Sequence, residues 1–225
     1  GLSDEINAFA SRQKTFRGEG GDEDAQHTFD IPRSHAEAMR SEYHKEWQTA
    51  CEDEIRSHDE CGTWKLVPRS QVPKEKKIIG STWAFDLKRN KENKIDRHKS
   101  RLCAQGFSQV AGFDYFRTYS NTVRYDTLRL VLAISARKGY HLSGADIKTA
   151  YLNSTIDDDL TIYMRQPKGF EKTGPKGEEM VCLLQKAIYG LKQSGARWEA
   201  RLVQYLLGAG FERCDVDPCL YLLRR

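Results

Sequence analysis

The sequence has no apolar run as long as the ~18 residues that a membrane span requires. It also has no signal-peptide pattern at its start, and its first residue is Gly rather than Met. We therefore expect no membrane association, and we expect the 225 residues to be a piece of a longer polypeptide.

Metal-binding cysteine patterns are missing too. The six cysteines form no Cys-x-x-Cys pair, and the six histidines have no spacing typical of a zinc site, with His58 and Cys61 as a lone weak pair. We therefore expect a reduced intracellular protein with structural cysteines. Apolar residues are few, at 39%, but at this length they suffice for a core.

Charge is present but uneven along the chain. Residues 1–62 carry 7 Lys or Arg against 15 Asp or Glu, whereas residues 63–225 carry 29 against 17. The densest basic stretch, residues 65–109, has 12 basic and 4 acidic residues. This asymmetry fits a basic body that binds a polyanion, and it fits equally well a basic surface that only maintains solubility.

The N-terminal segment differs from the rest in composition. Residues 1–33 mix glycine, acidic and polar side chains, which is typical of a flexible leader. Ser34 and Glu37 then fit a capping box, and apolar residues follow at helical spacing up to Ala50, with Gly62 as a stop. We divide the chain into a flexible acidic leader at 1–33 and a folded domain at 34–225.

Two extended stretches follow the first helix. Apolar residues alternate between Ile79 and Leu87, residues 89–93 form a polar turn, and alternation resumes at Ile95. The pattern predicts a β-hairpin, and its period of two places Arg97, Lys99 and Arg101 on one face. Such a face can bind phosphates, or it can be the charged surface of an edge strand that avoids aggregation.

The remaining elements predict an α+β domain, because helices and strands mix without a regular βαβ rhythm. We expect, in order, a helix capped by Asp126 and ended by Gly139, a strand at 140–147, a short helix near Lys148, strands at 160–164 and 181–184, a helix capped by Ser194, and a strand from Cys219.

Asp146 is an acid at the end of the strand expected at 140–147, and Tyr151 follows five residues later. Locally, Asp146 fits either a surface turn or a metal-binding carboxylate, and Tyr151 fits a core aromatic.

Several motifs occur in a fixed order over most of the chain. They are TWKLVP at 63–68, WAF at 83–85, HKSRLCAQGF at 98–107, ADIKTAYLN at 145–153, IYMRQPKGF at 162–170, IYGLKQS at 188–194 and DPCLY at 217–221. In this order and spacing they closely resemble the reverse transcriptase of copia-type retrotransposon Pol polyproteins, over residues 34–225.

The resemblance implies a right-hand polymerase with fingers and palm that copies RNA into DNA with two divalent metals, Mg²⁺ or Mn²⁺. Carboxylates hold such metals ~3.5–4 Å apart against the attacking and leaving oxygens. The implied partners are an RNA template, a DNA primer, deoxynucleoside triphosphates and the rest of the Pol polyprotein. The implied location is a cytoplasmic particle and the nucleus.

The resemblance also implies roles for individual residues. Asp146 matches the first metal-binding aspartate, at the end of a palm strand. The implied nucleotide contacts are Ile147 through its amide near the triphosphate, Tyr151 as the ring that rejects a ribose 2′-hydroxyl, Lys99 and Arg101 at the triphosphate, and Tyr189 and Gly190. The implied nucleic-acid contacts are Arg97 and Lys192. Relatives have Pro-Arg where Gly195-Ala196-Arg197 stands here, so Arg197 receives no role.

The family's other two metal-binding aspartates lie in a Tyr-Val-Asp-Asp hairpin, and this tetrapeptide occurs nowhere in the sequence. Residues 157–159 are an acidic triplet typical of a solvated loop, not a substitute site. We therefore expect a fragment, fingers plus the first half of the palm, truncated before that hairpin and unable to polymerise alone. The alternatives are a domesticated or relic non-catalytic module that binds nucleic acid or protein, and an unfolded pseudogene product.

Overall fold

The structure, a computed structural model, describes residues 31–157 and 159–224. The leader expected at 1–33 thus lies outside the described residues except for its last three positions. In chain order the elements are α2 (His35–Ala38), α3 (His44–Glu60), β1 (Trp64–Pro68), η2 (Arg69–Gln71), β2 (Ile78–Ile79), β3 (Ser81–Arg89), β4 (Ile95–Ala104), η3 (Gly106–Ser108), α4 (Tyr125–Lys138), η4 (Ala150–Asn153), β5 (Tyr163–Met164), β6 (Met180–Leu184), α5 (Ser194–Gly208), β7 (Glu212–Arg213) and β8 (Tyr221–Leu222). The mixture confirms the α+β class. Among these helices, none has both the length and the apolar character of a membrane span.

The first helical region is two helices rather than the single one expected. The Ser34 hydroxyl accepts from the Glu37 amide as predicted, but the Glu37 carboxylate accepts from the amide of Arg33. After α2 the Ser41 hydroxyl and amide both bond the Ala38 carbonyl, and this i+3 pattern interrupts the helical ladder. α3 then ends at Glu60 with Cys61 as its C-cap, and Gly62 adopts φ +60°, which confirms the predicted stop.

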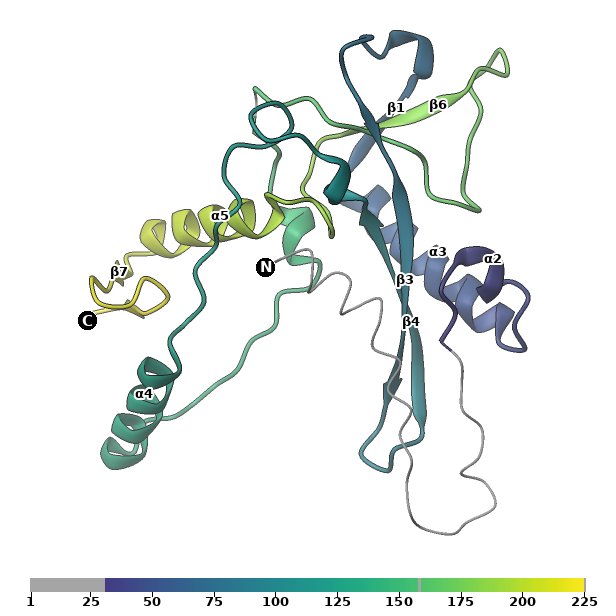
Figure 1. Cartoon of the computed structure of the whole chain (residues 1–225). Helices are drawn as coiled ribbons and strands as arrows, with labels where there is room; N and C mark the ends of the chain where they lie inside the picture. The colour runs from purple at the N-terminus through teal and green to yellow at the C-terminus, as the bar shows by residue number, and fades with distance from the viewer. Residues whose placement is uncertain (1–30, 158, 225) are drawn as a thin grey trace.

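The predicted hairpin forms from β3 and β4, with Trp83 opposite Leu102. Ile79 belongs instead to β2, which pairs in parallel with β5. β2 closes a four-stranded sheet of order β1-β6-β5-β2, in which Trp64 lies opposite Leu184 in an antiparallel pair. In Figure 1 the long hairpin runs between α3 and the chain that leads to α4.

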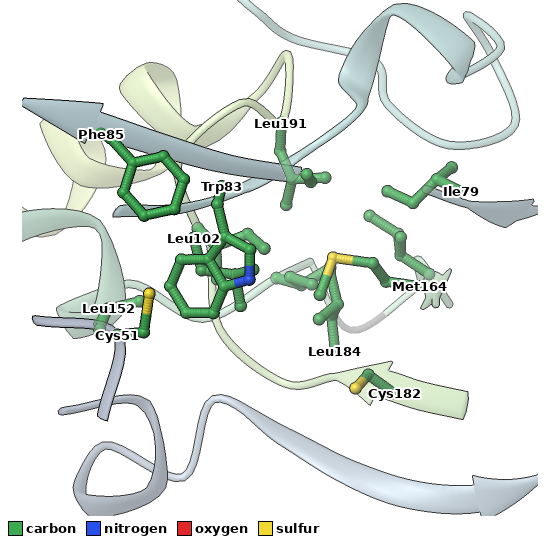
Figure 2. Close-up of a cluster of buried hydrophobic side chains, with 14 of the residues drawn as sticks. Cys51, Ile79, Trp83, Phe85, Leu102, Leu152, Met164, Cys182, Leu184 and Leu191 are labelled. Atoms are coloured by element: carbon green, nitrogen blue, oxygen red, sulfur yellow. The ribbon is translucent and has the colours of Figure 1, made fainter. Parts of the chain in front are cut away.

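The core lies where α3, the inner face of the hairpin and the four-stranded sheet meet. Trp83, Leu102 and Met164 come together there (Figure 2), and Leu102 is 0% exposed. Two hydrogen bonds fix the hairpin in this core: the Leu102 amide donates to the Glu54 carboxylate of α3 at 3.0 Å, and Trp83 Nε1 donates to the Lys168 carbonyl at 2.9 Å. One face of the hairpin is therefore buried against the core.

Two predicted helix caps are wrong in detail. Asp126 lies in the first turn of α4, and the preceding Arg124 amide donates to the distant Asp217 carboxylate at 3.1 Å. Ser194 is the first residue of α5, and its hydroxyl donates to the Ile188 carbonyl. Neither residue occupies the cap position, because the residues at these positions are Arg124 and Gln193, and neither of them makes a side-chain cap hydrogen bond.

The strand expected at 140–147 is absent from the described part of the chain. These residues form an exposed connection between α4 and η4 (Figure 1), with Leu142 and Ile147 exposed. A strand exists only as part of a ladder, and no described strand pairs with this segment. The palm strand that was to carry Asp146 is therefore not formed here.

Candidate nucleotide and nucleic-acid site

The outer face of β4 carries the predicted cations. Arg97, Lys99 and Arg101 alternate with residues on the inner face, where Ser100 and Leu102 are buried. Arg97 is exposed, and Lys99 and Arg101 are half-buried. We call these three residues the basic face.

The charges of the basic face are close enough to affect one another. Burial lowers the pKa of Lys99, and the neighbouring positive charges of Arg101, Arg97 and Lys88 lower it further. Asp86 lies opposite Lys99 in the hairpin register, but its carboxylate pairs with Lys88 at 2.6 Å. Within residues 31–157 and 159–224, none of the three cations forms an ion pair. The basic face is thus suited to an external anion.

Two predicted nucleotide contacts from distant segments meet next to the basic face. The rings of Tyr151 and Tyr189 pack edge to face with centroids 4.8 Å apart. The Arg101 guanidinium carbon lies 5.6 Å from the Tyr189 ring centroid. Burial, and then Tyr189, raise the pKa of the Tyr151 hydroxyl, which therefore stays protonated at neutral pH. We call Arg101, Tyr151 and Tyr189 the triad.

Gly190 lets the Tyr189 segment dock against the hairpin backbone. The Ala104 amide donates to the Tyr189 carbonyl at 2.7 Å, and Cys103 and Tyr189 form an isolated parallel bridge. Gly190 has φ +86°, and a Cβ on it would lie 2.1 Å from the Ala104 carbonyl oxygen. Only glycine allows both the backbone conformation and this approach.

Lys192 lies at the far end of the same segment. Its amide donates to Gln109 Oε1 at 2.9 Å, and its ammonium lies 5.7 Å from the Tyr115 ring centroid. β4, η4 and residues 188–192 thus lie next to one another. This brings together five of the predicted site residues: Arg101, Tyr151, Tyr189, Gly190 and Lys192.

Asp146 and Ile147 are exposed in the connection after α4. In the part of the chain that the structure describes, no hydrogen bond, ion pair or ring contact joins them to the triad. Thr149, between Ile147 and Tyr151, has φ +51°, a left-handed conformation that is rare for a β-branched residue. Asn153 supports this turn by donating from Nδ2 to the carbonyls of Lys148 and Thr149. The turn directs the chain into η4, which carries Tyr151.

The described residues do not by themselves fit a metal. No group of three or more His, Cys, Asp or Glu side chains in that part of the chain is arranged to hold one. Asp157 forms an ion pair with Arg197, whose Nε also donates to the Thr155 carbonyl at 3.2 Å. Arg197 therefore connects α5 to the acidic loop, and no step through a metal follows from these residues.

Asp217 is a residue that the sequence pattern did not single out for a role. It is 1% exposed, and its carboxylate accepts from the amides of Cys219 and Arg124 at 2.9 and 3.1 Å. The Thr127 hydroxyl, then these amides, hold the pKa of Asp217 below its usual range. An Asp-Pro pair indicates a turn, but nothing local indicates that this acid stabilises the start of α4.

A pocket lies behind the triad. Its wall includes Tyr151 from η4, Trp198 and Leu202 from α5, and Tyr221 from β8. Tyr151 therefore takes part both in this pocket and in the ring contact with Tyr189.

The class of protein to which this mixed α+β domain belongs follows from its sequence. The model of the family "Reverse transcriptase (RNA-dependent DNA polymerase)" matches residues 61–224. The chain belongs to this family.

The similar proteins are retrotransposon polyproteins, which confirms the copia-type resemblance. The chain is 36% identical over 195 residues to the retrovirus-related Pol polyprotein from transposon RE1 of Arabidopsis thaliana, covering 86% of this chain and 13% of that protein. It is 33% identical over 193 residues to that from transposon TNT 1-94 of Nicotiana tabacum, covering 86% and 14%. It is 31% identical over 158 residues to the transposon Ty1-NL2 Gag-Pol polyprotein of Saccharomyces cerevisiae, covering 69% and 8%. No solved structure matches the chain.

Proposed function

We propose that residues 34–225 form the fingers and the first half of the palm of a reverse transcriptase, and that the triad and the basic face receive the incoming deoxynucleoside triphosphate. The observation that carries this proposal is the convergence of Arg101 and Tyr151 on the Tyr189 ring, from segments far apart in the sequence.

The cations have a physical reason to bind a triphosphate. Burial and like charges disfavour the ammonium of Lys99, and an anion beside it offsets both effects. A unit charge pair 4 Å apart near a protein surface interacts by about 4 kcal/mol. Arg101 presents a planar donor fork that suits phosphate oxygens, and Arg97, further along the strand, contacts the template phosphates.

The tyrosines determine where the sugar lies. Tyr151 is half-buried and its ring packs edge to face on Tyr189, so its ring is held in place. A ring fixed in this way leaves no space for a ribose 2′-hydroxyl, whereas a flexible side chain would move aside. Gly190 brings backbone, rather than a side chain, close to the nucleotide and template base.

In the family, Mg²⁺ or Mn²⁺ supplies charge stabilisation at the reacting phosphate, and on this chain Asp146 would be one of its ligands once the missing carboxylates were present. One carboxylate does not hold two metals, and the Tyr-Val-Asp-Asp carboxylates are not among the 225 residues. We therefore propose that these residues alone do not polymerise. Primer extension over a titration of Mg²⁺ and Mn²⁺ tests this, and template-dependent synthesis by the purified chain would contradict it.

The nucleotide site has a test that needs no catalysis. We expect calorimetric binding of a deoxynucleoside triphosphate to weaken about tenfold or more in Lys99→Ala/Arg101→Ala, because two phosphate contacts are lost. The matched control, Lys91→Ala/Lys94→Ala, removes two exposed cations from the turn of the same hairpin. Equal losses in both variants would mean non-specific attraction and would contradict a site on the basic face.

A further inference from the structure

The segment after β4 exposes large apolar side chains. In residues 106–115, which we call the aromatic loop, Phe107 is 75% exposed and Phe113 71% exposed, and Val110 is exposed between them. In Figure 1 this part of the chain closes on itself above α5 before it descends to α4. Exposed apolar side chains that gather in one place indicate a binding surface.

This exposure does not arise from a loosely held loop. Three buried polar residues support it from inside: Gln109, Asp114 and Gln193. Gln109 Nε2 donates to Gln193 Oε1 at 3.1 Å, and Gln193 Nε2 donates to the Asp114 carbonyl at 2.9 Å. The Val110 amide donates to the Asp114 carboxylate at 2.8 Å. A loop with satisfied buried polar groups holds its phenylalanines outward.

The charge around the loop favours an anionic partner. Asp114 is the only acidic residue between Ala104 and Arg124, and its carboxylate faces inward. Lys192 lies over the Tyr115 ring at the base of the loop, and Arg117 is exposed just beyond it. The outer surface thus combines aromatic rings with cations.

The loop is also physically continuous with the triad. A Cβ on Gly106 would lie 2.0 Å from the Gly190 carbonyl oxygen, so the start of the loop packs directly on the segment that carries Tyr189. The same segment continues to Lys192, whose amide bonds Gln109. One strand of nucleic acid can therefore contact the basic face and the loop together.

We propose that the aromatic loop stacks unpaired bases of single-stranded nucleic acid, through Phe107 and Phe113, while Arg97 of the basic face and Lys192 bind its phosphates. The proposal rests on the proposed function, because it uses the same basic face. It favours nucleic acid over a protein partner because unpaired bases present flat apolar faces on a charged backbone, which matches rings interleaved with unpaired cations.

The test is equilibrium binding of a fluorescein-labelled single-stranded RNA of about 12 nucleotides, a length within the range of single-strand sites. Each stacked base accounts for roughly fivefold to a hundredfold in affinity. We expect Phe107→Ala/Phe113→Ala to bind at least tenfold more weakly than wild type. We expect its dependence on salt concentration to be unchanged, because no cation is removed.

An abasic oligonucleotide of equal length shows how much the bases contribute to the binding affinity. Wild type should bind it at least tenfold more weakly than the RNA with bases, and the double variant should bind both with similar affinity. Fully paired RNA should not distinguish wild type from the variant, since its bases are already stacked. An unchanged preference for bases in the variant contradicts the proposal.

Two further variants separate base stacking from a general effect of losing an exposed apolar side chain. Tyr205→Ala removes an aromatic residue that is equally exposed, on α5, and should leave affinity unchanged. Phe113→Leu keeps an apolar side chain without a flat ring, so retained affinity in this variant contradicts stacking. If Phe107→Ala/Phe113→Ala instead abolishes self-association in light scattering and leaves RNA binding intact, the loop is a protein interface and the proposal is wrong.

A separate variant tests whether the basic face binds phosphates, as the proposed function requires. Arg97→Ala/Lys99→Ala/Arg101→Ala should flatten the salt dependence for both the abasic and the normal RNA. If it does not, the basic face does not bind phosphates, whatever the phenylalanines do. If it does, and the phenylalanine variants still bind like wild type, only the stacking proposal fails.

Discussion

The carbonyl oxygen of Ala104 occupies the space that a side chain on Gly190 would need, 2.1 Å from the position of its Cβ. Gly190 is at φ +86° as well, so two separate constraints act on one residue. This contact joins the end of β4 to the segment that carries Tyr189.

Gly190→Ala should therefore destabilise the chain by two effects. A left-handed alanine costs about 1–2 kcal/mol, and the overlap with Ala104 adds about 1–3 kcal/mol. Gly177→Ala is the matched control, because Gly177 has φ +74° but nothing within 4 Å of the added Cβ. Urea unfolding measures both variants. Similar losses would show that the contact with Ala104 is unimportant.

Asp146→Asn should leave the 225-residue chain unaffected. The side chain is exposed in an unpaired connection, and such surface substitutions change the free energy of unfolding by less than about 0.5 kcal/mol. In a longer version that includes the Tyr-Val-Asp-Asp segment, the same change should reduce primer extension about a thousandfold or more, since metal charge stabilisation amounts to several kcal/mol. Asp159→Asn should retain activity there, and equal losses would remove the special role of Asp146.

Asp217 should make stability depend on pH in acid. The pKa of its carboxyl is lowered in the folded chain by the Thr127 hydroxyl and the Cys219 and Arg124 amides. Its contribution is therefore fully present above the unfolded pKa, about 3.9, and is lost as the pH falls through the folded pKa. Chemical unfolding of Asp217→Asn between pH 7 and pH 2 should show a smaller decrease than wild type.

Two observations check the origin of that effect. Asp215→Asn, two residues away and exposed, should follow the wild-type pH dependence. Hydrogen exchange at the amides of Arg124 and Cys219 should accelerate in Asp217→Asn but not in Asp215→Asn. An unchanged exchange rate at Arg124 would contradict the idea that Asp217 stabilises the start of α4.

Three thiols whose pKa is raised by burial should resist alkylation. Burial raises the pKa of Cys51 to about 11 and that of Cys103 and Cys182 to about 12, so little thiolate is present at pH 8. Iodoacetamide labelling followed by peptide mass spectrometry should modify these three only after unfolding in urea. Half-buried Cys61 is the internal comparison and should react first. Labelling of Cys182 at the rate of Cys61 would indicate a more open core.

The sequence predicted elements whose signal is local. The hairpin followed from alternation around a polar turn, and Gly62 and Gly139 followed from the need for positive φ at helix ends. The caps could not be predicted, because Asp126 and Ser194 have the right chemistry but lie inside their helices, while the distant Asp217 accepts from the Arg124 amide at the start of α4. Tertiary contacts decide between equivalent local choices.

One part of the candidate site could likewise be predicted from the sequence, and another part could not. Arg97, Lys99 and Arg101 could be placed on one face from a period of two alone. Their proximity to Tyr151 and Tyr189 could not, because it depends on docking three separate segments. The expected strand before Asp146 was wrong because alternation describes one strand and says nothing of whether a partner exists to pair with it.

The pairing of β1 with β6 has a consequence for synthesis on the ribosome. Trp64 lies opposite Leu184, so β1 leaves the exit tunnel more than a hundred residues before its partner. At roughly 5–20 residues per second, the backbone N–H and C=O groups of β1 lack their β6 partners for about 6–24 s. During that interval the nascent chain is open to aggregation, and a chaperone that covers the Trp64 strand should increase the yield of folded protein.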